Sequence, residues 1–161
     1  MIGKKGSHLS CSTLEEVYNG ESSIDPPEID LYQEKLNGNG VLELIQEKII
    51  TSCHDISDGG MIVTICEMIM MDDRGATINI VDNNKMIGEL FGEDQSRYII
   101  SISPELESVF EKKMKKRGVK YELIGCITSS QLKINDSIII SNNEIRGAYE
   151  SLIPSVMNNM A

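Results

Sequence analysis

The segment His54-Asp55-Ile56-Ser57-Asp58-Gly59-Gly60 constrains the fold most, because it separates two apolar stretches of different periodicity. Ile50 to His54 before it predicts a short strand. The apolar residues after it recur at helical spacing from Met61 to about Asp72. Two adjacent glycines allow the chain to turn sharply between them. The sequence therefore predicts a strand-to-helix junction in an α/β domain.

Besides the helix that follows this junction, the sequence predicts three more. One covers Val41 to Lys48, with Gly38 and Gly40 interrupting it or delaying its start. Another begins at Ser103-Pro104-Glu105, where serine can cap and proline fits the first turn, and ends at Gly118. Asn142-Asn143 is expected to cap a last helix. The pattern thus predicts about four helices.

Five or six strands are expected from apolar and β-branched runs. After Ile50 to His54 they are Ala76 to Val81, Arg97 to Ile102, Val119 to Ile127, and a hairpin of Leu132 to Ile134 and Ser137 to Ile140 that turns at Asn135-Asp136. Helices and strands in this order indicate an α/β or α+β fold with a mixed sheet.

The first 27 residues differ in composition from the rest of the chain. They are rich in glycine, serine and lysine, and they end at Pro26-Pro27, which breaks any regular element. We therefore interpret residues 1–27 as an arm or linker from a preceding, missing domain, and residues 28–161 as the folded domain.

Composition excludes several classes of function. The 161 residues carry a formal net charge of −10, so nucleic acid and anionic membranes are unfavourable partners. The four cysteines and two histidines lack zinc-site spacing and indicate free thiols in a reducing compartment. No signal peptide is visible, and the longest apolar stretch is too short to span a bilayer. We expect a soluble, cytoplasmic protein.

The junction segment has two interpretations. Backbone amides and the positive end of the helix could bind a phosphate, with Gly59 and Gly60 permitting its close approach. Asp55 and Asp58 would repel a bare phosphate, so this interpretation requires a divalent ion. Alternatively, Ser57 or Asp58 caps the helix and His54 bonds to a neighbouring carbonyl, which is the commoner arrangement.

A second polar cluster, Gly92-Glu93-Asp94-Gln95-Ser96-Arg97, lies just before an apolar strand. Glu93 or Asp94 could bind a metal, Gln95 could recognise an amide or ribose, and Arg97 could contact a phosphate. The alternative is an acidic loop with a local ion pair between Arg97 and one of the two acids. The sequence alone favours the alternative and specifies no metal ligand set.

The two segments together resemble one family in order and spacing. His54 to Gly60 followed by Leu90-Phe91-Gly92-Glu93-Asp94-Gln95-Ser96-Arg97-Tyr98 is similar to the last domain of phosphoribosylformylglycinamidine synthase of the large-subunit type. The resemblance covers nearly the whole chain. One region departs from the family pattern, because Ser10 and Cys11 stand where glycine and glutamine are expected.

The resemblance implies a fold like the C-terminal domain of aminoimidazole ribonucleotide (AIR) synthetase. It also implies a parent ligase of purine biosynthesis that requires ATP and magnesium and receives ammonia from a glutaminase subunit or domain. The family's catalytic residues lie in parts absent here, so this chain should carry none and be inactive alone. The resemblance places His54, Asp58, Glu93, Gln95 and Arg97 along a second, degenerate cleft, with no certain cofactor of its own.

The sequence also leaves other origins for the chain open. It could be a stand-alone nucleotide-binding or scaffold domain of the same fold. A relative such as a selenophosphate or thiamine-phosphate kinase-type enzyme fits the Phe91 to Gln95 segment poorly. If the chain is an excised domain, its partners are the remaining domains of the synthase, and an uncovered apolar face should make it self-associate.

Overall fold

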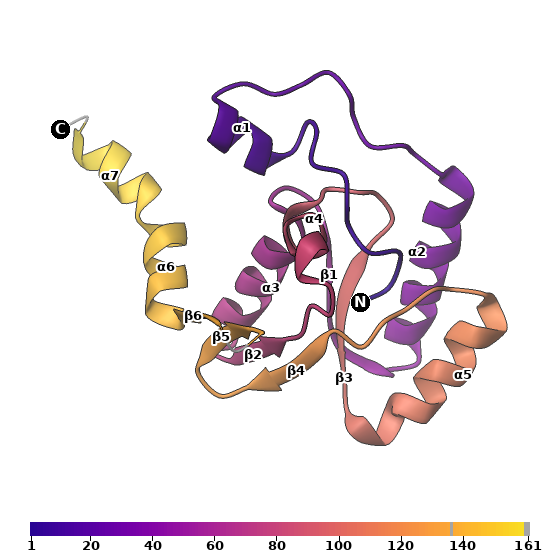
Figure 1. The fold of residues 1–161 in the computed structure, drawn as a ribbon. Helices are drawn as coiled ribbons and strands as arrows, with labels where there is room; N and C mark the ends of the chain where they lie inside the picture. Colours follow the sequence, from indigo (N-terminus) through magenta and orange to yellow (C-terminus); the bar gives the residue numbers. More distant parts are fainter. Residues whose placement is uncertain (136, 160–161) are drawn as a thin grey trace. The chain divides into compact units, whose positions relative to one another are not determined.

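The computed structural model describes residues 1–135 and 137–159, which divide into two compact units (Figure 1). Unit 1 contains Met1–Thr64 and Asp82–Leu123. Unit 2 contains Ile65–Val81 and the described residues from Ile124 onward. Within the described ranges, no helix combines the length and apolar character needed to cross a membrane.

Unit 1 is built around the predicted strand-to-helix junction. Strand β1 (Ile50–Asp55) pairs antiparallel with β3 (Tyr98–Ile102), so His54 lies opposite Ile99 and Asp55 opposite Tyr98. Helix α3 (Gly60–Met71) follows β1 and continues into unit 2. The other elements of unit 1 are α1 (Thr13–Asn19), α2 (Leu31–Gln46), η1 (Asn83–Lys85), α4 (Met86–Phe91), η2 (Pro104–Leu106) and α5 (Glu107–Arg117).

A core cluster in unit 1 joins α2 and α5 to the strand pair, and Figure 1 shows the two helices side by side. Its buried members are Ile2, Val41, Leu44, Ile49, Phe110, Met114 and Val119. The Phe110 ring meets Tyr121 edge-on, with ring centroids 5.0 Å apart. Burial of these side chains is the main favourable contribution to the stability of unit 1.

The beginning of the chain differs from the expected arm. Ile2 is fully buried and exchanges two backbone hydrogen bonds with Tyr98 (N to O distances of 2.8 and 3.1 Å). The N–H of Gly3 donates to the carbonyl of Lys120 at 2.9 Å. Met1 to Gly3 is therefore part of unit 1, because the apolar pair Met1-Ile2 enters the core ahead of the glycine- and serine-rich residues.

Unit 2 contains a four-stranded mixed sheet in the order β4-β2-β5-β6. Strand β2 (Gly75–Ile78) pairs antiparallel with β4 (Gly125–Thr128) and parallel with β5 (Gln131–Ile134). The predicted hairpin is confirmed by antiparallel β5 and β6 (Ile138–Ser141), although Asp136 of its turn lies outside the described residues. Helices α6 (Asn142–Glu150) and α7 (Leu152–Asn159) follow.

Helix α2 is longer than predicted. It begins at Leu31, with the Asp30 side chain accepting the N–H of Gln33 at 3.0 Å, and passes through Gly38 and Gly40 without a break. A Cβ on Gly40 would lie 3.3 Å from Cγ2 of Val119. The small residue thus allows α2 to approach its neighbour closely, and this tertiary packing outweighs the low helix propensity of glycine.

Two expected strands are shorter in the structure. Strand β2 stops at Ile78, because the Asn135 side chain bonds both backbone groups of Ile80 (2.7 and 2.9 Å). Strand β4 starts only at Gly125, since Tyr121 forms an isolated bridge with Ile2 instead. Both expectations extended a strand through apolar residues outside the sheet ladders, of which Ile80 and Val119 are buried and Val81 and Leu123 are exposed.

Two predicted caps are also wrong. Ser103 makes no side-chain capping bond, and a short 3₁₀ turn at Pro104 leads into α5. The last helices begin with a capping box of Ser141 and Glu144, not with an asparagine cap. The Asn142 side chain instead donates to the carbonyl of Arg74 at 2.7 Å. The described chain holds seven α-helices rather than about four, because α1, α4 and α7 had no predicted counterpart.

Candidate functional site

A cleft of about 360 Å³ in unit 1 brings the two predicted polar segments together; we call it the motif cleft. Its lining residues are Cys11, Pro26, Pro27, Glu34, Asp55, Ile56, Ser57, Asp58, Glu93, Gln95, Ser96, Arg97 and Tyr98. Six of the eleven predicted site residues are among them: Asp55, Ser57, Asp58, Glu93, Gln95 and Arg97. The other five, His54, Gly59, Gly60, Gly92 and Asp94, lie outside this lining.

The turn from β1 into α3 depends on its two glycines. Gly59 and Gly60 have φ angles of 79° and 71°, a region that glycine enters without steric penalty. A Cβ on Gly60 would lie 2.7 Å from the carbonyl oxygen of Leu90. Gly60 therefore allows the start of α3 to lie directly against the end of α4.

The start of α3 is held by Glu93 rather than by a local cap. Oε1 of Glu93 accepts the N–H of Gly59 at 2.7 Å, and the carbonyl of Ser57 accepts the N–H of Gly60 at 3.0 Å. In the described part of the chain, neither Ser57 nor Asp58 uses its side chain as a cap. The expected cap is thus wrong, because a carboxylate from the second segment supplies the acceptor.

Glu93 also joins the beginning of the chain to this junction. The same Oε1 atom accepts the N–H of Thr13, the first residue of α1, at 2.8 Å. The first amides of a helix lack partners within the helix and favour a negative charge. One carboxylate oxygen therefore satisfies backbone donors from two separate segments.

Asp94 fixes the segment that precedes α1. Its Oδ2 accepts the N–H groups of Ser7 at 2.7 Å and of His8 at 3.0 Å. Burial alone would raise the pKa of Asp94, but these two bonds and the nearby charge of Arg97 lower it below its ordinary value. The ionised carboxylate is thus the form that the fold stabilises.

Arg97 is almost fully buried, with 1% of its surface exposed. Its Nε donates to the carbonyl of Asp94 at 2.8 Å, and its Nη2 donates to the carbonyl of Gly92. Burial lowers the pKa of Arg97, while the charges of Asp94 and Glu93 oppose that shift. The expected local ion pair is replaced by bonds to backbone carbonyls, which shape the loop around the guanidinium group.

Glycines of the N-terminal segment make room for this arginine. A Cβ on Gly6 would lie 2.5 Å from Nη1 of Arg97, and one on Gly3 would lie 2.9 Å from its Cγ. Arg97 therefore packs directly against the backbone of this segment. The segment before α1, the Gly92 loop and β3 are joined through one side chain.

The remaining predicted residues are more exposed. His54 is partly buried, and its Nδ1 lies 2.7 Å from the carbonyl oxygen of Asp55 and 3.4 Å from Oδ1 of the same residue. The carbonyl contact is the one that the structural interpretation of His54 predicts. Asp55, Ser57, Asp58 and Gln95 are exposed residues at the mouth of the motif cleft.

One wall of the motif cleft was not predicted. Glu34 of α2 accepts the hydroxyl of Ser96 at 2.5 Å and that of Tyr98 at 3.3 Å. Burial and the negative charge of Glu34 raise the pKa of Tyr98. The Asn37 side chain donates to the carbonyl of Ser96 at 2.8 Å. Glu34 and Asn37 lie one helical turn apart. This spacing would indicate that they act together only if α2 were predicted to begin at Leu31.

The motif cleft is acidic. Glu34, Asp55, Asp58 and Glu93 line it, and Arg97 is the single basic residue among its lining residues. No group of three histidine, cysteine, aspartate or glutamate side chains is arranged to hold a metal ion anywhere in the described ranges. The cleft can accept hydrogen bonds from a neutral or cationic group, whereas its carboxylates repel a phosphate that arrives without a cation.

Comparison with known proteins gives consistent results. The family described as AIR synthase related protein, C-terminal domain, matches residues 1–136. Phosphoribosylformylglycinamidine synthase subunit PurL of Brucella ovis is 34% identical over 158 residues, which are 98% of this chain. The match covers 21% of that relative, so the chain spans about a fifth of its length.

Solved structures show the same fold. T. maritima PurL complexed with FGAR matches with a TM-score of 0.68 at 14% identity, covering 87% of this chain and 26% of that one. T. maritima PurL complexed with ATP matches with a TM-score of 0.66 at 14% identity, covering 87% of this chain and 24% of that one. At this identity the likeness concerns the fold alone, and it confirms the predicted α/β class.

Proposed function

This chain belongs to the family described as AIR synthase related protein, C-terminal domain, and we propose that it is the last domain of a phosphoribosylformylglycinamidine synthase. The observation that carries the proposal is the similarity to subunit PurL of Brucella ovis over 98% of the chain. Both polar segments that suggested the family from sequence also meet in one cleft of unit 1.

Under this proposal the parent protein is an ATP-dependent carbon–nitrogen ligase of purine biosynthesis. It transfers phosphate from ATP to the amide oxygen of formylglycinamide ribonucleotide, with magnesium. Ammonia from a glutaminase partner then displaces that phosphate and forms the amidine. The catalytic groups lie in other domains of the parent. Four free cysteines agree with a reducing, cytoplasmic setting.

We assign this domain an architectural role in the parent. Glu93 and Asp94 bond to backbone amides of Gly59, Thr13, Ser7 and His8, and Arg97 bonds to two backbone carbonyls. The groups best suited to bind a ligand are therefore used to hold the chain's own loops. Such bonds hold a surface in one shape, which is what a docking domain requires.

The motif cleft does not fit a nucleotide triphosphate by itself. Four carboxylates line it, Nε and Nη2 of Arg97 already donate to carbonyls while its Nη1 is buried, and no set of metal ligands is assembled within the described chain. A bound polyphosphate would face uncompensated repulsion. We therefore assign no ATP-dependent step of the parent reaction to this domain.

Complementation tests the proposal directly. A parent synthase that lacks this domain is expected to be inactive, and the separate chain added to it is expected to restore amidine formation. The Arg97→Ala chain should fail to restore activity, whereas the Arg117→Ala chain, changed on an exposed helix, should restore it. Full activity of the truncated parent, or failure of the folded wild-type chain to restore activity, would contradict the proposal.

A further inference from the structure

Residues 7–27, which we call the strap, are attached to unit 1 with little apolar packing. No residue of α1 is buried, and Val17, Tyr18 and Ile24 are 79%, 86% and 98% exposed. Within this segment Ser12 alone belongs to the buried class. Apolar burial supplies most of the stability of an ordinary element, so the strap must be held in another way.

Carboxylates and one backbone bond, from the N–H of Glu93 to the carbonyl of His8 (3.1 Å), hold the strap in place. At its start Asp94 accepts the N–H groups of Ser7 and His8. In its middle Glu93 accepts the N–H of Thr13 at 2.8 Å. The strap is also folded on itself, because Oε2 of Glu15 accepts the N–H groups of Cys11 (2.8 Å) and Ser23 (3.0 Å).

The strap forms one wall of the motif cleft. Cys11, Pro26 and Pro27 line the cleft from the strap, and Asp55 and Asp58 line it from the β1–α3 junction. Oε1 of Glu93 bonds to both walls, through the N–H of Thr13 and the N–H of Gly59. Glu93 is therefore the group through which the two walls are linked.

Both ends of the strap are fixed in unit 1. Gly6 is buried against Arg97 before it, and α2 begins soon after it at Leu31. In Figure 1 the chain leaves α1 as an extended segment and enters α2. A loop with fixed ends and few apolar contacts can open while the core remains folded.

We propose that the strap is a lid on the motif cleft, and that Glu93 is the latch that keeps it closed. Breaking the Glu93 bond to Thr13 releases the strap from α1 onward, while Asp94 still holds its start at Ser7 and His8. The cleft then opens to solvent without unfolding of unit 1. This inference concerns access to the cleft, so it goes beyond the proposed role in the synthase and does not depend on it.

Alkylation of cysteines by iodoacetamide, resolved by peptide mass spectrometry, measures this opening. Cys11 reports on the strap, because it is partly buried and lines the motif cleft in the closed state. Cys53 of β1 and Cys66 of α3 report on the folding of the rest of the chain, and exposed Cys126 gives the rate of an accessible thiol. The full 161-residue chain is used throughout.

Glu93→Gln removes the charge of the latch, and Glu16→Gln makes the same change on α1 at an exposed position. Hydrogen bonds to a charged acceptor are about twice as strong as neutral ones. We expect alkylation of Cys11 to become roughly tenfold faster in Glu93→Gln and to stay at the wild-type rate in Glu16→Gln. Alkylation of Cys53 and Cys66 should be unchanged in both.

Three results would contradict the proposal that the strap is a lid. Cys11 could react as fast as Cys126 in the wild type, which would mean that the strap is not closed. Glu93→Gln could leave the Cys11 rate unchanged, which would mean that Glu93 is no latch. Finally, the rates of Cys11, Cys53 and Cys66 could rise together in both Glu93→Gln and Glu93→Ala, which would make Glu93 a residue for global stability only.

Discussion

The motif cleft region and the outer face of α2 and α5 use the same residue types with different partners. Arg97 in the first region is buried and donates to backbone carbonyls of Asp94 and Gly92. Arg117 in the second has a side chain that is 38% exposed and forms an ion pair with Glu43. Lys113 joins the same network at a partly buried position, with its Nζ 2.8 Å from Glu43 and 2.7 Å from Glu47.

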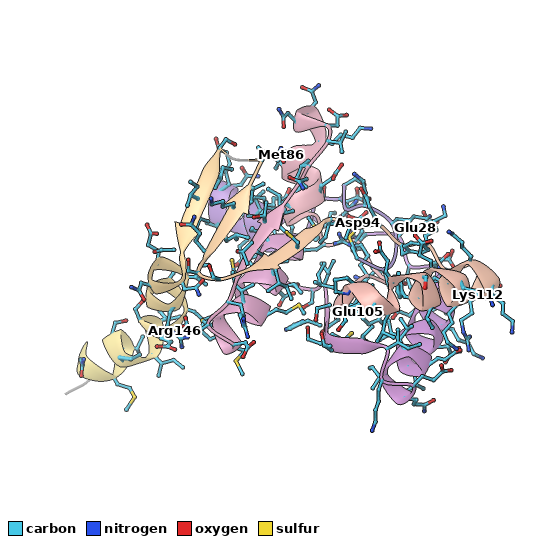
Figure 2. All side chains as sticks on the ribbon, turned by 90° about the horizontal axis from the view of Figure 1, so that it is seen from below. Glu28, Met86, Asp94, Glu105, Lys112 and Arg146 are labelled. Carbon is cyan, nitrogen blue, oxygen red and sulfur yellow. The ribbon has the colours of Figure 1, made fainter. Side chains whose placement is uncertain are left out.

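The difference indicates that a charged side chain of this protein contributes most to stability where it bonds to backbone groups away from water. Exposed ion pairs gain little, because water and salt screen them and long side chains lose freedom on pairing. Lys112 also belongs to this outer face of α5, far from Asp94 in Figure 2. Within the cleft region Glu93, Asp94 and Arg97 satisfy backbone donors or acceptors that would otherwise lose their partners.

Replacing the two arginines gives the largest expected contrast. Arg97→Ala should lower the free energy of unfolding by roughly 3 to 5 kcal/mol, because it leaves two carbonyls unpaired and a cavity beside the N-terminal segment. Arg117→Ala should leave it nearly unchanged. Urea denaturation followed by circular dichroism measures both. Equal losses in the two variants would remove the distinction between the regions.

Two glycines with the same backbone conformation sharpen the comparison. Gly60 and Gly118 have φ angles of 71° and 70°, but a Cβ would collide with Leu90 and Phe91 at Gly60 and would meet open space at Gly118. Gly118→Ala should destabilise by about 1 kcal/mol from backbone strain alone. Gly60→Ala should destabilise by about 2 to 3 kcal/mol, since packing must also shift. Similar midpoints in thermal denaturation would show that the contacts of Gly60 are unimportant.

The pH dependence of the free energy of unfolding should distinguish Asp94 from exposed acidic residues. Since the pKa of Asp94 is lowered in the folded chain, the unfolded chain binds more protons near pH 4. Its contribution is complete above the unfolded pKa and is lost as pH falls through the lower folded pKa. Asp94→Asn should destabilise by about 1 to 2 kcal/mol at pH 7, and the gap should narrow below about pH 4. A gap that stays constant down to pH 3 would exclude this linkage.

The exposed network should show the smallest effect. Glu43→Gln removes the acceptor shared by Lys113 and Arg117, yet these groups remain hydrated. We expect a slightly lower denaturation midpoint at low ionic strength and no difference in 0.5 M salt, where the Debye length is only about 4 Å. If the midpoint of Glu43→Gln stays lower in 0.5 M salt, then this network contributes more to stability than an ordinary exposed ion pair.

The sequence predicted elements whose pattern is local. The β1–α3 junction follows from an apolar run, two glycines and helical spacing, and all of these lie within Ile50 to Met71. The β5–β6 hairpin has the same character. The sequence did not predict the start of α2, because the low helix propensity of glycine takes no account of the close approach between Gly40 and Val119. Burial of Ile2 was missed because it depends on pairing with Tyr98, far away in the chain.

For the motif cleft, the sequence identified the residues better than their roles. The two polar segments were expected to matter, and they do meet in one cleft. The partners of Glu93, Asp94 and Arg97 could not be predicted, because they are backbone groups of the first 13 residues, of Gly59 and of the loop itself. The contribution of Glu34 depended on the unexpected length of α2.

The central claim is that the charged groups of the motif cleft organise this domain and do not form a nucleotide site by themselves. Isothermal titration of the folded chain with ATP, with and without magnesium, tests this claim directly. The account predicts no saturable heat under either condition. Saturable binding that Asp58→Asn abolishes, while circular dichroism stays unchanged, would contradict it and would make the motif cleft a nucleotide site in its own right.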